Sequence, residues 1–149
     1  MPPKGGSPGA NRGTDPSAMA LELLFSFDPS DLLLFVGFAP GGGELKSPED
    51  VDRFERALEV QCQPLQKRVH LFFDLENLAV PSDLIERFAN RKRLLCERFA
   101  LSSWHFGGHL AERVMTRNDF TRRGAKPNLF RNRDDAVAAF RKARLYAAL

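Results

Sequence analysis

An apolar run in the sequence ends in polar side chains that could take part in chemistry. The segment Val69 to Leu75 reads as a strand, with Asp74, Glu76 and Asn77 at its end. Carboxylates at such a position could hold a divalent metal, but metal-dependent hydrolysis needs several acidic groups that converge on one ion. No later acidic residue ends an apolar strand, so we expect neither a metal site nor catalysis here.

A serine follows the same strand and opens the next predicted helix, which runs from Ser82 to about Phe99. A serine at this position can act as an N-cap, whose hydroxyl accepts a hydrogen bond from a backbone N–H of the first turn. A kinase could instead phosphorylate Ser82, although Asp83 and Glu86 would then repel the phosphate. The sequence leaves both roles of Ser82 open.

Two histidines that are close in sequence and two cysteines are the other candidates for metal or nucleophilic chemistry. His105 and His109 are four residues apart, but the glycines between them predict a loop, so they do not share a helix face. Cys62 and Cys96 lie in helical patterns without zinc-site spacing, which indicates reduced, buried thiols. Since no nucleophile-elbow motif is present either, we expect a protein that is not an enzyme and needs no cofactor.

Hydrophobic patterns and turn residues predict an α/β domain in which strands and helices alternate after an opening hairpin. The predicted order is β-β-α-β-α-β-α-β-α, in a mixed sheet whose later crossovers are right-handed. The predicted elements are strands 21–27 and 32–38, a helix from Ser47 and Pro48 to about Pro64, strand 69–75, helix 82–99, strand 101–106, a short helix from His109, a weak strand led by Pro127 and a last helix capped by Asn132.

The first residues differ in composition from the rest of the chain. Residues 1–18 are rich in Pro, Gly and Ser without apolar periodicity, so we expect a disordered leader before a single domain at 19–149. No apolar run approaches the roughly 20 residues that a membrane helix needs. We therefore expect a cytoplasmic protein with no membrane partner.

Charge is divided unevenly along the sequence. Residues 1–86 hold 7 Lys/Arg and 14 Asp/Glu, whereas residues 87–149 hold 15 and 5. The basic half could recruit an acidic partner or a nucleic acid, or the two halves could face each other within one domain. Because no compact basic run or interleaved aromatic pattern is present, nucleic acid is not the expected partner.

One basic residue falls within an apolar helix face. In the predicted helix 82–99, Phe88, Leu95 and their helical neighbours share a face, and at 100° per residue Lys92 lies in its middle. Its side chain must extend to solvent, the helix must bend near Asn90, or the amine must reach an acid such as Glu59. The sequence does not choose among these.

Three segments in this order resemble the STAS superfamily, and more specifically the bacterial STAS/SEC14-like proteins. They are "LLLFVGF" before a Ser-Pro-capped helix, "VHLFFDLENL" ending in a carboxylate, and the closing "NLFRNRDDAVAAF". The resemblance covers roughly residues 20 to 149. It implies a STAS-like fold and a non-enzymatic regulatory module that binds a protein, such as a kinase or a transcription regulator.

The resemblance also implies a role for the turn after the central strand. In phospho-regulated members this turn carries a serine that a partner kinase phosphorylates, and Ser82 is the hydroxyl at that place. The small glycine that usually follows the family's serine is replaced here by Asp83 and Leu84. Ser82 is therefore the candidate phosphorylation site, with a departure from the family pattern beside it.

Two alternative functions remain from the sequence. A small apolar ligand or lipid could bind, as in the wider STAS/SEC14-like group, and would require an apolar pocket of roughly several hundred Å³ between sheet and helices. The stretch "FFDLEN" also resembles the opening of NYN/PIN-type nucleases, in which Asp74 and Asn77 would match the Asp-x-x-Asn spacing. That motif should open the fold, whereas here a hairpin and a helix precede it.

Overall fold

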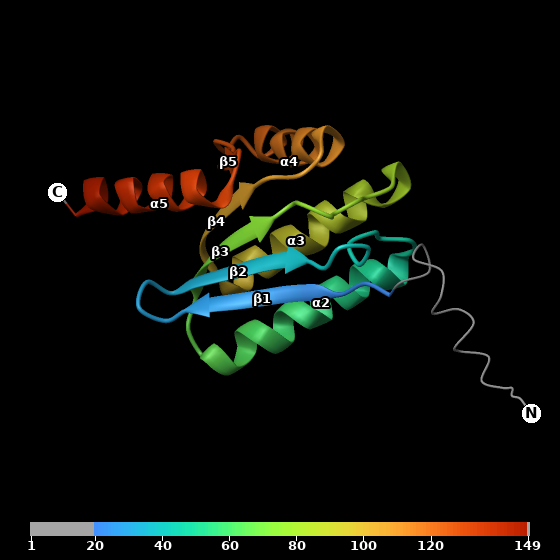
Figure 1. Ribbon diagram of the computed structural model, residues 1–149, viewed down its shortest axis with the longest axis horizontal. Helices are drawn as coiled ribbons and strands as arrows, with labels where there is room; N and C mark the ends of the chain where they lie inside the picture. The colour runs from blue at the N-terminus through green and yellow to red at the C-terminus, as the bar shows by residue number, and fades with distance from the viewer. Residues whose placement is uncertain (1–19, 149) are drawn as a thin grey trace, which may run out of the picture.

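A five-stranded mixed sheet forms the centre of the computed structural model, which describes residues 20–148 (Figure 1). The strands lie side by side in chain order, and neighbours are parallel except for the antiparallel first pair. They are β1 (Leu23–Asp28), β2 (Leu33–Phe38), β3 (Val69–Asp74), β4 (Ala100–Phe106) and β5 (Leu129–Phe130). The predicted α/β class, with its opening hairpin and order of elements, is confirmed. The predicted leader, residues 1–18, lies outside the described residues.

Within residues 20–148, three helices and two short 3-10 turns connect the strands, and a fourth helix follows the last strand. They are α2 (Pro48–Cys62), η2 (Gln63–Leu65), η3 (Ser82–Leu84), α3 (Ile85–Phe99), α4 (Leu110–Arg122) and α5 (Arg133–Ala147). In the part of the chain that the structure covers, no helix is both long and apolar enough to cross a membrane.

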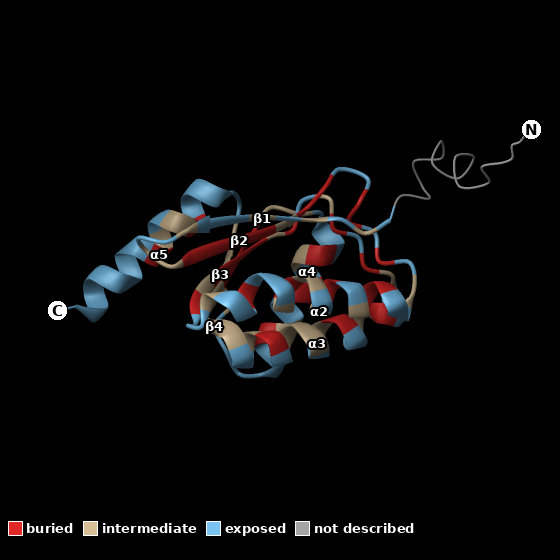
Figure 2. Cartoon of the chain, turned by 90° about the horizontal axis from the view of Figure 1, so that it is seen from below, coloured by how far each residue is buried: buried red, intermediate tan, exposed pale blue. Residues whose placement is uncertain are grey.

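The alternation of side chains along the strands divides the core into two layers. On one face of β2 and β3, residues such as Val36 and Leu71 pack against α2 and α3, together with Phe54 and Phe88. On the other face, Phe72 belongs to a second cluster that α5 covers. Because parallel strands are buried on both faces, they read as continuous apolar runs, and Figure 2 shows β2 and β3 as buried between the layers.

The helix α5 covers only part of its face of the sheet. Phe140 of α5 packs edge-on against Phe72 and Trp104, with ring centroids 5.6 and 5.7 Å apart. Farther along α5, Leu145 and Tyr146 are exposed, and the helix extends past the sheet (Figures 1 and 2).

Two predicted helix starts are confirmed, with different local bonding. Asn132 precedes α5 and its Oδ1 accepts a 2.9 Å hydrogen bond from the Asp135 N–H, as an N-cap does. Ser47 is the N-cap residue of α2, but its hydroxyl makes no capping bond. There the carboxylate of Asp50 accepts from the Lys46 N–H at 2.8 Å instead.

Candidate interaction site at the β3 to α3 connection

The connection that follows β3 is fixed to the connection that follows β2. Ala79 N–H donates to Gly43 O, and Leu45 N–H donates to Ala79 O, both at 3.0 Å. A Cβ atom at Gly43 would lie 2.0 Å from the backbone oxygen of Asn77, so only glycine allows this approach. Val80 N–H also donates to Glu112 Oε2 of α4 at 3.2 Å. The connection after β2 and the helix α4 therefore both hold this connection in place.

Asn77 has a structural contact in this connection. Its φ is 68°, in the left-handed region that asparagine tolerates better than most residues. Its Nδ2 donates to Phe38 O at 3.0 Å, at the end of β2. The side chain that would match the nuclease spacing is thus used to hold the backbone.

Asp74 ends β3 and Glu76 follows it, and both carboxylates lie near Gly107, which follows β4. Asp74 Oδ1 accepts the Glu76 N–H at 2.9 Å. Partial burial raises the pKa of Asp74, against the lowering effect of this hydrogen bond. A Cβ at Gly107 would lie 3.4 Å from both Asp74 Oδ1 and Glu76 Oε1, so the carboxylates approach the same point. Within residues 20–148 no three metal-binding side chains gather.

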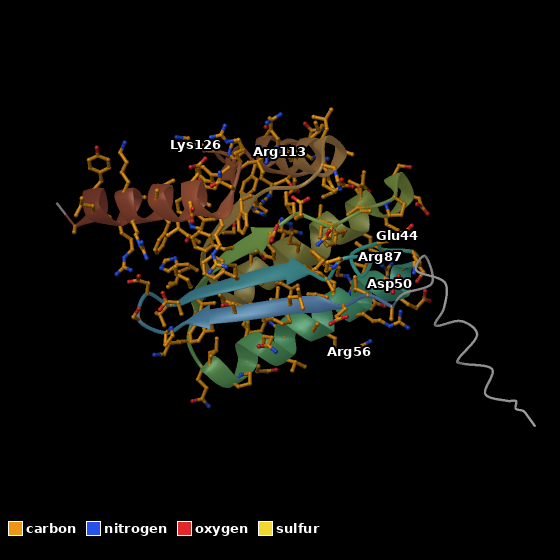
Figure 3. The ribbon with its side chains drawn as sticks, viewed as in Figure 1. Glu44, Asp50, Arg56, Arg87, Arg113 and Lys126 are labelled. Carbon is orange, nitrogen blue, oxygen red and sulfur yellow. The ribbon has the colours of Figure 1, made fainter. Side chains whose placement is uncertain are left out.

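Arg113 of α4 anchors the neighbouring segments at this end of the sheet. Its Nη1 donates to Gly107 O and to Phe130 O, both at 2.9 Å (Figure 3). The side chain therefore ties the start of α4 to the turn after β4 and to the edge strand β5. This bonding stabilises the turn that borders the two carboxylates.

The predicted N-cap role of Ser82 is wrong. The 3-10 turn η3 begins after Pro81, whose carbonyl accepts the Leu84 N–H at 2.9 Å, and Leu84 is the N-cap residue of α3. Ser82 is thus the first residue inside the turn, where its hydroxyl caps neither helical segment. It is exposed, and in the described part of the chain its hydroxyl has no hydrogen-bond partner. Its accessibility suits modification or contact with another molecule.

A groove adjoins the turn that contains Ser82. It has a volume of about 790 Å³ and runs between α3 and α4, bordered by Asp83 and Leu84 of η3. Five arginines and three acidic residues contribute to its walls: Arg87, Arg91, Arg93, Arg122, Arg123, Asp83, Glu86 and Asp119. A groove with both charge signs suits a polar protein surface better than an apolar ligand.

The uneven charge of the sequence resolves into contacts between the two halves of the domain. Arg91 of α3 binds Glu55 of α2 at 2.5 Å, and Arg98 binds Glu59 at the same distance. Near the hairpin, Arg144 of α5 lies 3.0 Å from Asp31. The interpretation that basic and acidic halves face each other is therefore confirmed.

Lys92 does not extend to solvent and does not reach Glu59. Its Nζ lies 2.5 Å from Nε2 of His105 on β4 and 4.6 Å from the ring centroid of Phe73. Burial lowers the pKa of Lys92 to about 8, and burial together with the Lys92 charge lowers the pKa of His105 well below its usual value. The helical pattern flagged Lys92 as unusual, but its partner comes from a strand that sequence spacing could not place beside it.

The other sequence candidates fall where their patterns indicated. Cys62 is buried and Cys96 partly buried, and both thiols are free, as predicted. Burial raises the pKa of the Cys62 thiol to about 11, which keeps it protonated at neutral pH. His109 is the exposed N-cap residue of α4, whereas His105 is buried in β4, so the two histidines do not form a pair.

The arrangement of a β-hairpin followed by alternating parallel strands and helices is the STAS fold. Among solved structures, the chain is similar to the anti-sigma factor antagonist SpoIIAA in its unphosphorylated form. The TM-score is 0.53 at 13% sequence identity, and the match covers 81% of this chain and 97% of that chain. No protein-family model matches the sequence, and no curated protein matches it. The predicted resemblance is confirmed at the level of the fold.

Proposed function

We propose that this protein is a non-enzymatic regulatory module that binds a partner protein in the cytoplasm. The surface proposed for binding comprises the η3 turn around Ser82 and the adjoining groove between α3 and α4. The observation that carries the proposal is an exposed, unbonded serine at the edge of a fixed connection in a STAS fold. A rigid surface of this kind limits the conformational entropy lost on binding.

Phosphorylation of Ser82 by a kinase is the proposed means of regulation. A phosphate adds about two negative charges at neutral pH. Asp83 and Glu86 lie in the same turn and at the start of α3, so the added charge would concentrate negative potential at the proposed surface. The expected consequence is release of a partner that approaches with an acidic or apolar face.

The two alternatives have less support from the geometry. The nuclease interpretation requires Asn77 to act beside Asp74, but the Asn77 amide donates to the backbone of Phe38. The ligand interpretation requires an apolar cavity between sheet and helices. The hollow between α3, α4 and β4, beside Lys92 and His105, measures only about 20 Å³, enough for about one water molecule. The larger hollows beside the sheet are open at the surface and have charged residues in their walls, so neither is an apolar cavity closed by sheet and helices.

Affinity capture from the source cells, followed by mass spectrometry, identifies candidate partners. Each candidate is then purified, and hydrogen exchange is measured on this protein alone and in the complex. The proposal predicts slower exchange in residues 82–91 and in the α4 residues that border the groove. Slower exchange confined to other surfaces, or the absence of any partner that binds in purified form, would contradict it.

A further inference from the structure

The strand β1 presents unpaired backbone groups at one edge of the sheet. It pairs with β2 on one side, and within residues 20–148 no strand pairs with it on the other. Glu22 O accepts the Ala39 N–H at 3.0 Å, so the backbone groups of residue 22 point toward β2. In an antiparallel pair this direction alternates along the strand. The N–H and C=O groups of Leu23, Phe25 and Phe27 therefore point outward.

This edge lacks the features that normally prevent strand pairing. Proteins protect edge strands with lysine, proline, bulges or a covering segment. The sequence of β1, LLFSFD, contains no proline and no basic residue, and its pairing with β2 is regular over six residues. Leu24 and Phe27 are 49% and 37% exposed. Among residues 20–148, the edge is thus open to an additional strand.

A hollow lies beside this edge on the face that α2 covers. Its volume is about 350 Å³, and its apolar wall consists of Phe25 of β1 with Ala57 and Val60 of α2. Val60 is 64% exposed although it is a large apolar residue. In Figure 1 the carboxyl-terminal half of α2 extends beyond β1, so it lies beneath the place of an added strand.

The charges around the hollow indicate the chemistry of its occupant. Arg53 and Arg56 border it, and no carboxylate contributes to its walls. Arg53 is paired with Asp50, whereas Arg56 has no partner in the described part of the chain and lies on the outer side of α2 (Figure 3). If a second copy of this chain paired through β1, its arginines beside the hollow would approach the same arginines of the first copy. An acidic segment complements these arginines instead.

We infer that β1 accepts an extended segment of a partner protein as a sixth strand of the sheet. Backbone hydrogen bonds to residues 23, 25 and 27 provide the pairing, as in β-augmentation. Alternate side chains of the segment are apolar and enter the hollow at Phe25 and Val60, and an acidic residue pairs with Arg56. This surface is separate from the Ser82 turn and does not depend on the function proposed for it.

Selection from a random peptide display library on the full chain tests this inference. Enriched peptides are synthesised, and their affinities are measured for the wild type and for Phe27→Pro, which removes an outward N–H. Proline is tolerated at an edge strand where the N–H faces solvent. Phe27→Thr is the matched control, because it removes the same aromatic ring and retains the N–H. Circular dichroism and thermal unfolding establish that both variants fold.

The expected peptides carry apolar residues at every second position, with an acidic residue in the same every-second-position series, and bind Phe27→Pro at least about tenfold more weakly than Phe27→Thr. The affinity of these peptides should also be lower for Arg56→Glu and unchanged for Ser82→Asp. This difference separates the β1 surface from the proposed regulatory surface. Equal binding to the two Phe27 variants, or no enriched peptide, would overturn the inference. So would a dimer of the wild type that Phe27→Pro dissociates, or hydrogen-exchange protection of β1 that deletion of residues 1–19 removes.

Discussion

The Nζ atom of Lys92 lies 2.5 Å from the Nε2 atom of His105, between α3 and the sheet. Burial of the imidazole favours its neutral form, so Nε2 accepts a hydrogen bond from the Lys92 ammonium group. The ring proton is then on Nδ1, which is buried and has no partner among the described residues. An unsatisfied buried donor and a lysine with a lowered pKa both reduce the stability of the folded state.

The first prediction concerns this lysine at alkaline pH. The folded-state pKa of Lys92 is about 8, below its ordinary 10.5, so between these values the unfolded chain binds a proton that the folded chain does not. Stability of the wild type should therefore rise with pH over this window, relative to Lys92→Met. Urea unfolding of both proteins at several pH values measures this difference.

Both proteins in this comparison carry Cys96→Ser, because the Cys96 thiol lies beside Lys92 and the Lys92 charge affects its pKa. Asp119 of α4 and Arg123, which follows α4, also face Lys92, and they are present in both proteins. A difference in unfolding free energy that stays constant from pH 8 to 10.5 would show that Lys92 titrates normally.

The second prediction concerns His105 at acidic pH. Its folded-state pKa lies well below the ordinary 6.5, so below pH 6.5 the unfolded chain gains a proton that the folded chain excludes. The free energy of unfolding should therefore be highest above this pH and should decrease progressively as the pH falls below it. Urea unfolding of the wild type and His105→Gln between pH 7 and 5 measures the effect. Parallel curves for the two proteins would argue against a neutral His105.

The third prediction compares Asn132 with Ser82, because both positions resemble helix N-caps in the sequence. Asn132→Ala should cost about 1 kcal/mol, because it removes the side-chain bond to the Asp135 N–H. Ser82→Ala should change stability by less than about 0.5 kcal/mol, because its hydroxyl caps nothing. Chemical denaturation of both variants provides the values. Similar losses at the two positions would mean that Ser82 is a cap after all.

The fourth prediction concerns the close approach of the two connections. Gly43→Ala should destabilise the domain by about 3 kcal/mol or more, because its Cβ would lie 2.0 Å from Asn77 O, a backbone atom. Gly42→Ala is the matched control, since its Cβ would lie 3.2 Å from the Glu22 side chain. Thermal unfolding compares the two. A Gly43→Ala protein as stable as Gly42→Ala would contradict the described packing of the connections.

The sequence predicts the fold better than the site, and particular residues show why. The apolar runs of β2 and β3 and the Asn132 cap are local signals, so they identify elements without tertiary information. The role of Ser82 depends on which residue precedes the turn. Because Pro81, with its extended backbone, is the N-cap residue of η3, the turn begins one residue earlier than the sequence pattern predicts. Lys92 and His105 meet only because α3 packs across β4, and periodicity carries no information about that contact.

The groove beside Ser82 shows that the positions of charged residues on the surface are equally hard to predict from the sequence. Arg87 and Arg91 are visible in the sequence as part of a basic half, but their pairing with acids of α2 arises from the side-by-side, parallel packing of two helices. Arg122 comes from α4 and joins the same groove. Sequence charge counts therefore indicate an imbalance without locating the surface that results.

In the proposed function, a partner protein binds at the Ser82 turn. Isothermal titration of the purified partner into the wild type, Ser82→Asp and Gln63→Glu tests it most directly. Gln63 is exposed in η2, which precedes β3 and so lies at the opposite end of that strand from Ser82, and its substitution adds the same charge. We expect Ser82→Asp to weaken binding by at least about tenfold and Gln63→Glu to bind like the wild type. Equal affinities for all three proteins would contradict it.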